Sequence, residues 1–291
     1  MLMTLENSRF RVETDSLGAQ LLSIWDKDAG REYLWQGPAP FPRASVLFPW
    51  CGPLAGGRFL EEGKEYPADG RGFSAAMKHK LVCQDDSLVC YRMESGPETA
   101  KLSPYQFSVK TTYALKEERI SSRFKVVNYG DGAMYFRCGF LTALNLPFVP
   151  GTTREDYDLL LEQPAALTLL ERDGDGLLTG ESRMWEPEDG RIPASGEALA
   201  GGLLLKEPPV QYLQLTCRTT GEFVRVQLRD STHLSLRAGG TPEEGFLAVG
   251  VLYGTPDSRD SDPRPEKKEE ITALGGMEEF YAHQAIEIGT V

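Results

Sequence analysis

The stretch that decides the fold reads FSVKTTYALKEERISSRFKVV and runs from Phe107 to Val127. Every second side chain from Phe107 to Leu115 falls on one face of the chain, which is the period of a β-strand. The polar residues Lys116 to Arg119 then predict a turn, and Ile120 to Val127 has the composition of a returning strand. This stretch therefore predicts an antiparallel hairpin.

Similar short runs recur on both sides of the hairpin, separated by clusters of Gly, Pro, Asp and Asn. They are Phe10–Val12, Leu21–Trp25, Leu88–Met93, Val210–Thr216, Phe223–Leu228, Leu234–Leu236, Phe246–Leu252 and Ala285–Ile288. No segment keeps the spacing of a long amphipathic helix, and 30 Gly with 19 Pro suit a chain with many turns. We expect an all-β fold, a large antiparallel β-sandwich in a single domain over residues 1–291. Polar composition predicts long loops at 172–200 and 255–270.

Bulk composition excludes several classes of partner. The net charge is −12, and no cluster of Lys and Arg offsets it, so nucleic acid is not expected as a partner. No run is long and apolar enough for a membrane span, and the first residues lack the pattern of a secretory signal. The five scattered cysteines fit reduced thiols, which predicts a cytoplasmic location. Composition leaves the oligomeric state open.

Metal and cofactor motifs are not found in the sequence. His79, His233 and His283 lie far apart, without the spacing of zinc ligands. The run from Glu171 to Gly176 resembles a calcium loop, but Ser182 stands where such a loop needs its bidentate Glu, so a turn-rich loop is favoured. His79 lies between Lys78 and Lys80, which predicts an exposed strand edge. We expect no metal and no cofactor.

Several short segments, taken in order along the chain, resemble the LacX-type branch of the aldose 1-epimerase (galactose mutarotase) family. They are Leu5–Asn7, Leu17–Ile24, Glu32–Gly37, Val46–Gly52, Gly63–Tyr66, Val127–Gly130, Asn145–Pro147, Tyr253–Asp257 and the region around Leu274. The resemblance covers nearly the whole chain. It implies a galactose mutarotase-like supersandwich with a sugar or a sugar derivative bound on the concave face of one sheet.

Mutarotation needs a base for the anomeric hydroxyl proton and an acid for the ring oxygen. In the family these groups are a Glu and a His, and a second His and an Arg hold the sugar. The matched positions here carry Gly250 for the base, Leu141 for the acid, Arg71 for the second His and Pro53 for the Arg. Neither Gly250 nor Leu141 can transfer a proton.

Three functions remain open at this point. The first is a carbohydrate-binding homologue with lost or much reduced mutarotase activity, whose site includes Arg71, Trp50, Asn145, Glu244 and Tyr253. The second is an active epimerase with relocated groups, for which the candidates are Glu244, Glu243, His79 and His233. The third is a non-catalytic structural or interaction protein with a closed cleft.

Overall fold

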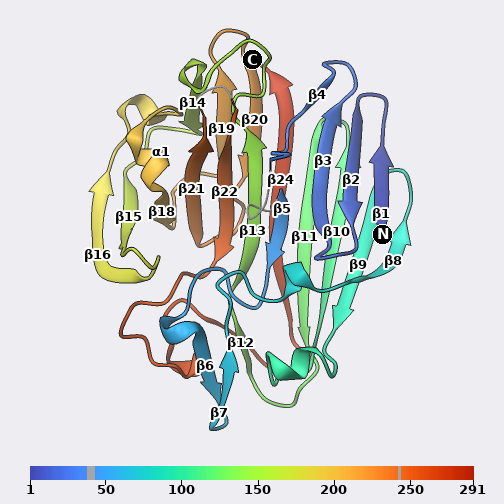
Figure 1. Ribbon diagram of the computed structural model, residues 1–291, viewed down its shortest axis with the longest axis vertical. Coiled ribbons are helices and arrows are strands. Elements are labelled where there is room, and N and C mark those ends of the chain that lie inside the picture. Colours follow the sequence, from blue (N-terminus) through green and yellow to red (C-terminus); the bar gives the residue numbers. More distant parts are fainter. Residues whose placement is uncertain (38–42, 242–243) are drawn as a thin grey trace.

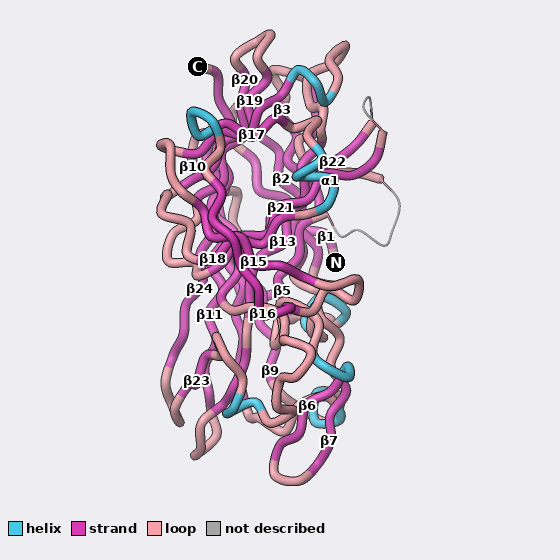
Figure 2. Tube along the Cα trace, turned by 90° about the vertical axis from the view of Figure 1, so that its left-hand side faces the viewer, coloured by secondary structure: helices cyan, strands magenta, loops and turns pink. Residues whose placement is uncertain are grey.

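The computed structural model describes residues 1–37, 43–241 and 244–291. Within this part of the chain, two large antiparallel sheets account for most of the strands (Figure 1). Figure 2 shows the strands stacked in layers, with the β6–β7 hairpin at one end of the molecule. These features confirm the all-β sandwich expected from the alternating pattern. No helix in the described ranges is long and apolar enough to cross a membrane.

The first sheet has the order β1-β2-β3-β5-β13-β22-β21-β18-β15-β16, with β4 paired to β3. Its strands are β1 Leu2–Glu6, β2 Phe10–Asp15, β3 Gln20–Asp26, β4 Arg31–Glu32, β5 Ala44–Leu47, β13 Cys138–Asn145, β15 Leu167–Arg172, β16 Leu178–Trp185, β18 Leu203–Lys206, β21 His233–Gly240 and β22 Gly245–Tyr253.

The second sheet has the order β17-β14-β19-β20-β24-β11-β10-β9-β8. Its strands are β8 Lys80–Gln84, β9 Leu88–Glu94, β10 Phe107–Lys116, β11 Arg119–Asn128, β14 Tyr157–Leu161, β17 Arg191–Pro193, β19 Tyr212–Cys217, β20 Glu222–Gln227 and β24 Glu279–Thr290.

Smaller elements complete the described chain. They are the pair β6 Arg58–Glu61 and β7 Lys64–Pro67, the pair β12 Met134–Phe136 and β23 Thr272–Leu274, the helix α1 Glu197–Gly201, and the 3-10 turns η1 Ala55–Gly57, η2 Ser74–Ala76, η3 Thr99–Lys101, η4 Arg154–Asp156, η5 Glu188–Gly190 and η6 Pro265–Lys267.

Strand alternation places the core between the two large sheets. In the hairpin of β10 and β11, Leu115 pairs with Ile120, and both side chains are buried in the main hydrophobic cluster. Strand β22 of the first sheet contributes Leu247, Val249 and Val251 to the same cluster. Because successive side chains of a strand point to opposite faces, the residues between these three lie on the outer face of the first sheet.

Two sequence expectations are corrected by the structure. The expected long loop at 172–200 contains β16, whose side chains are mostly exposed, as well as β17. β16 is an edge strand without a buried face, so its sequence lacks the apolar alternation by which strands are predicted. His79 is 1% exposed and not part of an exposed edge. The loop of residues 72–79 folds it inward, where its Nε2 lies 3.1 Å from the carbonyl oxygen of Ser74.

A buried carboxylate, Asp257, joins loops from distant parts of the chain. Its oxygens accept hydrogen bonds from Arg137 Nη1 at 2.8 Å, Lys268 Nζ at 2.6 Å and the backbone N–H of Ala55 at 3.1 Å. The side chains of Arg137 and Lys268 are no more than 2% exposed. Gly254 has a φ of 120°, and a Cβ there would lie 2.6 Å from Arg137 Cγ, so the cluster requires glycine at this position.

We predict that Asp257→Asn lowers the free energy of unfolding by about 3–5 kcal/mol, because two buried cations lose their counterion. Chemical denaturation measures this change. The matched control is Asp230→Asn, which removes an ion pair with Arg229 whose side chains are 68% and 74% exposed. The control is expected to cost about 0–1 kcal/mol. Equal, small effects of the two substitutions would refute the role given to Asp257.

Candidate functional site

The outer face of the first sheet carries a row of small and apolar side chains. The register pairs Leu141 with Ser45 and with Gly250, Gly250 with Ser235, and Ser235 with Leu204. These five positions therefore cross β5, β13, β22, β21 and β18 side by side on one face. We call this set the floor row.

Three connected hollows lie over the floor row, and together they form what we call the cleft. The largest has a volume of about 630 Å³, and it shares Leu141, Arg172 and Ser235 with a second hollow of about 290 Å³. A third, of about 210 Å³, shares Asp69 and Arg71 with the second. The volume of the largest hollow lies within the range of about 300–1,000 Å³ that is typical of small-molecule sites.

One wall of the cleft is the loop of residues 69–72. Asp69 Oδ1 accepts a hydrogen bond from the backbone N–H of Arg71 at 2.8 Å, which closes a tight turn. Gly72 has a φ of 68°, and a Cβ there would lie 2.1 Å from the carbonyl oxygen of Phe48. Glycine therefore lets the loop lie directly on β5 and the residues after it, so that Asp69 and Arg71 line the cleft.

The opposite end of the cleft is rich in arginine. Arg172, Arg183 and Arg237 line the largest hollow together with Glu171 and Asp173. Glu171 forms an ion pair with Arg183 at 3.0 Å, and Asp173 forms one with Arg259. Arg172 donates a hydrogen bond to the carbonyl oxygen of Gly202 at 3.1 Å. Burial lowers the pKa of Arg172, and the nearby charge of Arg237 lowers it further.

Two aromatic rings lie beside the floor row. Trp35 and Phe246 are 5.5 Å apart between ring centroids, and they pack with Leu141 and Ala248. Neither residue is among the binding residues predicted from the sequence. The alternation of β22 contained the signal for Phe246, because every second residue from Phe246 to Leu252 shares the face of Gly250. Strand alternation on β21 likewise places Arg237 on the same face as Ser235, two residues further along the strand.

Comparison with known proteins agrees with this architecture. The sequence model of the family described as aldose 1-epimerase matches residues 1–194. The chain belongs to the aldose 1-epimerase family. It is 31% identical to the chromosomal LacX protein of Lactococcus lactis over 285 residues, which cover 94% of this chain and 95% of the relative. The plasmid LacX protein of the same organism is 27% identical over the same shares.

Solved structures share the fold. A galactose mutarotase related enzyme from Lactobacillus acidophilus has a TM-score of 0.92 and 22% identity, covering 100% of this chain and 98% of that one. A galactose mutarotase-like protein from Lactobacillus casei has a TM-score of 0.89 and 24% identity, covering 99% of this chain and 100% of that one. The expected supersandwich fold is confirmed.

The positions matched to the family's acid and base come together in the cleft. Leu141 and Gly250 are directly paired on β13 and β22, in the middle of the floor row. A Cβ on Gly250 would lie 2.2 Å from Ser235 Oγ, so the serine hydroxyl takes up the space beside the glycine. Arg71 and Pro53, matched to the sugar-holding His and Arg, line the second hollow with Leu141.

Other expected binding residues lie away from the cleft lining. Trp50 is 2% exposed and packs against Phe59 in a separate hydrophobic cluster. Tyr253 points into the core, where its hydroxyl donates a hydrogen bond to the carbonyl oxygen of Arg229 at 3.0 Å. Asn145 donates to the carbonyl oxygen of Glu32 at 2.7 Å. These three residues have structural contacts in place of a sugar.

The candidates for a relocated acid or base are also separated from the floor row. Glu244 is an exposed residue of the turn between β21 and β22, and six strand residues place it about 20 Å from Gly250. Glu243 lies outside the described residues. His79 is buried behind Ser74. His233 lies about 7 Å along β21 from Ser235, but it is completely buried.

Buried His233 makes stability depend on pH. Burial lowers the pKa of His233 from 6.5 to about 4, with the charges of Lys206 and Arg137 also lowering it and that of Glu270 opposing them. Its ring Nδ1 lies 2.9 Å from Thr232 Oγ1. Since the unfolded chain binds this proton more readily, the stabilisation is complete above pH 6.5 and is lost as the pH falls toward 4.

We predict that His233→Gln reduces the loss of unfolding free energy between pH 7 and pH 4 by roughly 3 kcal/mol. Denaturation at a series of pH values measures it. His283→Gln is the control: burial lowers the pKa of His283 too, but this side chain is only half-buried, so a smaller reduction is expected. If His233→Gln loses as much unfolding free energy between pH 7 and pH 4 as the wild type, His233 is not the group whose protonation destabilises the fold.

Proposed function

We propose that this chain binds a sugar in the cleft and has lost, or greatly reduced, the mutarotase activity of its family. The observation that carries the proposal is the pairing of Leu141 with Gly250 at the centre of the floor row. Neither side chain has a group that exchanges a proton. General acid and base groups contribute about 10²–10⁴-fold each, so their loss leaves little acceleration.

The other described residues that line the cleft do not supply a replacement pair of acid and base. Among the described residues that line the three hollows, none is a histidine, lysine or tyrosine. Burial raises the pKa of Cys51 to about 12, which keeps its thiol protonated and inactive as a base. Arginine stays charged and is a poor proton donor. A carboxylate such as Asp69 would need a second carboxyl group as its acid. Those of the described lining, Glu171, Asp173 and Glu197, lie in the largest hollow, which Asp69 does not line.

The capacity to bind remains. The cleft is open, and its main hollow of about 630 Å³ is edged by charged side chains that suit a polar ligand. Trp35 and Phe246 supply an apolar edge next to Leu141. An interaction protein with a closed cleft fits this arrangement less well than a protein that holds a sugar.

We predict no acceleration of mutarotation over a buffer blank when polarimetry follows freshly dissolved α-glucose or α-galactose with the protein. Calorimetry with millimolar sugars is expected to detect binding in the same preparation. Acceleration would refute the loss of activity, and its disappearance in Asp69→Asn would then identify Asp69 as the base. Asp173→Asn is the matched control, because Asp173 is held in its ion pair with Arg259.

A further inference from the structure

At the arginine end of the cleft, two cations form no ion pair with a described carboxylate, although the charge of Glu171 acts on Arg172 by raising its pKa against the effect of burial. Of the lining carboxylates there, Glu171 and Asp173 form ion pairs with Arg183 and Arg259. Within the described chain, Arg172 and Arg237 have no carboxylate within ion-pair distance.

The backbone brings these two arginines to either side of one glycine. Gly202 immediately precedes β18, which lies between β15 and β21 in the sheet. A Cβ on Gly202 would lie 3.2 Å from Arg172 Nη2 and 3.8 Å from the Cβ of Arg237. The absence of a side chain at Gly202 therefore leaves space for the guanidinium of Arg172 beside the base of the Arg237 side chain. The two charges are close enough that Arg237 lowers the pKa of Arg172 further than burial alone does.

Arg172 and Arg237 lie close enough to the floor row for one ligand to contact the floor row and an arginine together. Arg237 follows Ser235 by two residues on the same face of β21, a separation of about 7 Å. Arg172 lines the first and second hollows, which meet at Leu141 and Ser235. A ring lying on the floor row thus has an arginine within reach of a substituent at its edge.

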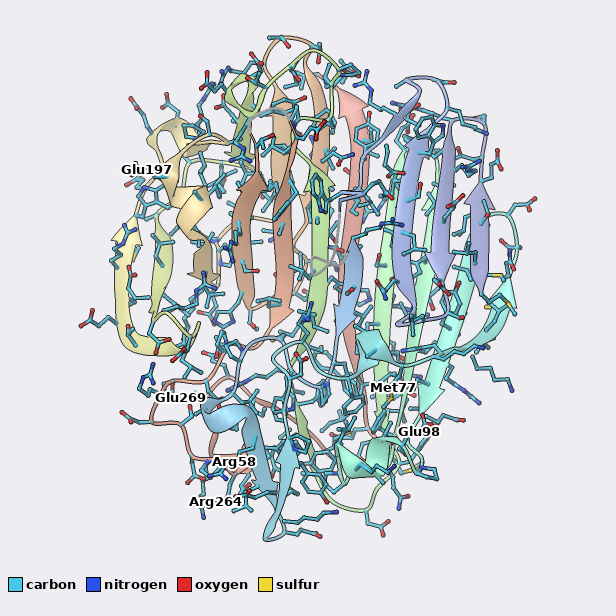
Figure 3. The ribbon with its side chains drawn as sticks, in the orientation of Figure 1. Arg58, Met77, Glu98, Glu197, Arg264 and Glu269 are labelled. Carbon is cyan, nitrogen blue, oxygen red and sulfur yellow. The ribbon has the colours of Figure 1, made fainter. Side chains whose placement is uncertain are left out.

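We propose that Arg172 and Arg237 form an anion subsite that binds the phosphate ester or carboxylate of a sugar lying on the floor row. This inference rests on the proposed function. Guanidinium groups bind such anions through paired, charge-assisted hydrogen bonds. Glu197, at the start of α1 and labelled in Figure 3, also lines this hollow and is exposed, so it weakens the positive field.

The test is calorimetry of the full chain with four probes: glucose, glucose 6-phosphate, glucuronate and inorganic phosphate. We expect one or both anionic sugars to bind at least about tenfold more tightly than glucose, with an advantage that falls at higher salt. The ratio of glucose 6-phosphate to glucuronate distinguishes the phosphate ester from the carboxylate.

Variants assign the effect to the two arginines. Arg237→Gln, on an exposed side chain, is expected to remove about tenfold of the affinity for the anionic sugar and to change the affinity for glucose much less. Arg172→Lys keeps the charge but loses the paired geometry, and it is expected to weaken the same probe. Glu197→Gln is expected to strengthen anionic binding by about two- to fivefold. The control is Arg11→Gln, which makes the same charge change in the exposed pair with Glu13 on β2.

Several outcomes would overturn the subsite. Equal affinity for glucose and both anionic sugars would refute it while leaving the proposed function standing. An anionic advantage untouched by Arg237→Gln would also refute it. Inorganic phosphate binding as tightly as the phosphorylated sugar would mean that the arginines hold an anion without a sugar. Absence of binding by every probe would refute the proposed function as well.

Discussion

The structure around the cleft depends on one buried carboxylate with two buried cations. Asp257 accepts hydrogen bonds from Arg137 and Lys268, and its backbone N–H and C=O bind the carbonyl oxygen of Pro53 and the N–H of Leu178. A single residue thereby fixes the loop before β6, the start of β16 and the loop after β22. Pro53 and Pro256, which line the second hollow, take their places from this arrangement. Because each ion is costly to bury alone, the three groups hold these loops only as a set.

The sheet beneath these loops separates the residues of the cleft from those of the core. Strand alternation commits one face of β13, β22 and β21 to the core and the other to the cleft. Substitutions at Leu141 and Gly250 thus alter the cleft without touching the core packing of Leu144 or Val249. Ser235 Oγ lies against Gly250, so the floor row is continuous at this position. Charge in this cleft is instead gathered at its edges, by Arg71 on one side and by Arg172 and Arg237 on the other.

The sequence was most informative where period 2 is strong. The hairpin of Phe107 to Val127 formed as expected because both strands bury one face in the core. Strand β16 was missed because its exposed edge carries no such pattern. At the site, matching the sequence to the motifs of the family led to Leu141, Gly250, Arg71 and Pro53. The structure places all four residues in one cleft. Trp50 and Tyr253 point into the core and Arg237 points to the cleft, and these directions depend on sheet pairing that a linear sequence does not contain.

We propose that the cleft holds a sugar without transferring its protons. Magnetisation-exchange NMR on anomeric mixtures of glucose and glucose 6-phosphate tests both halves at once. We expect the sugar resonances to broaden on addition of the protein, which reports binding, with no increase in the rate of exchange between the α and β anomers. Accelerated anomer exchange by the wild-type protein would contradict the account, as would unbroadened resonances for both sugars.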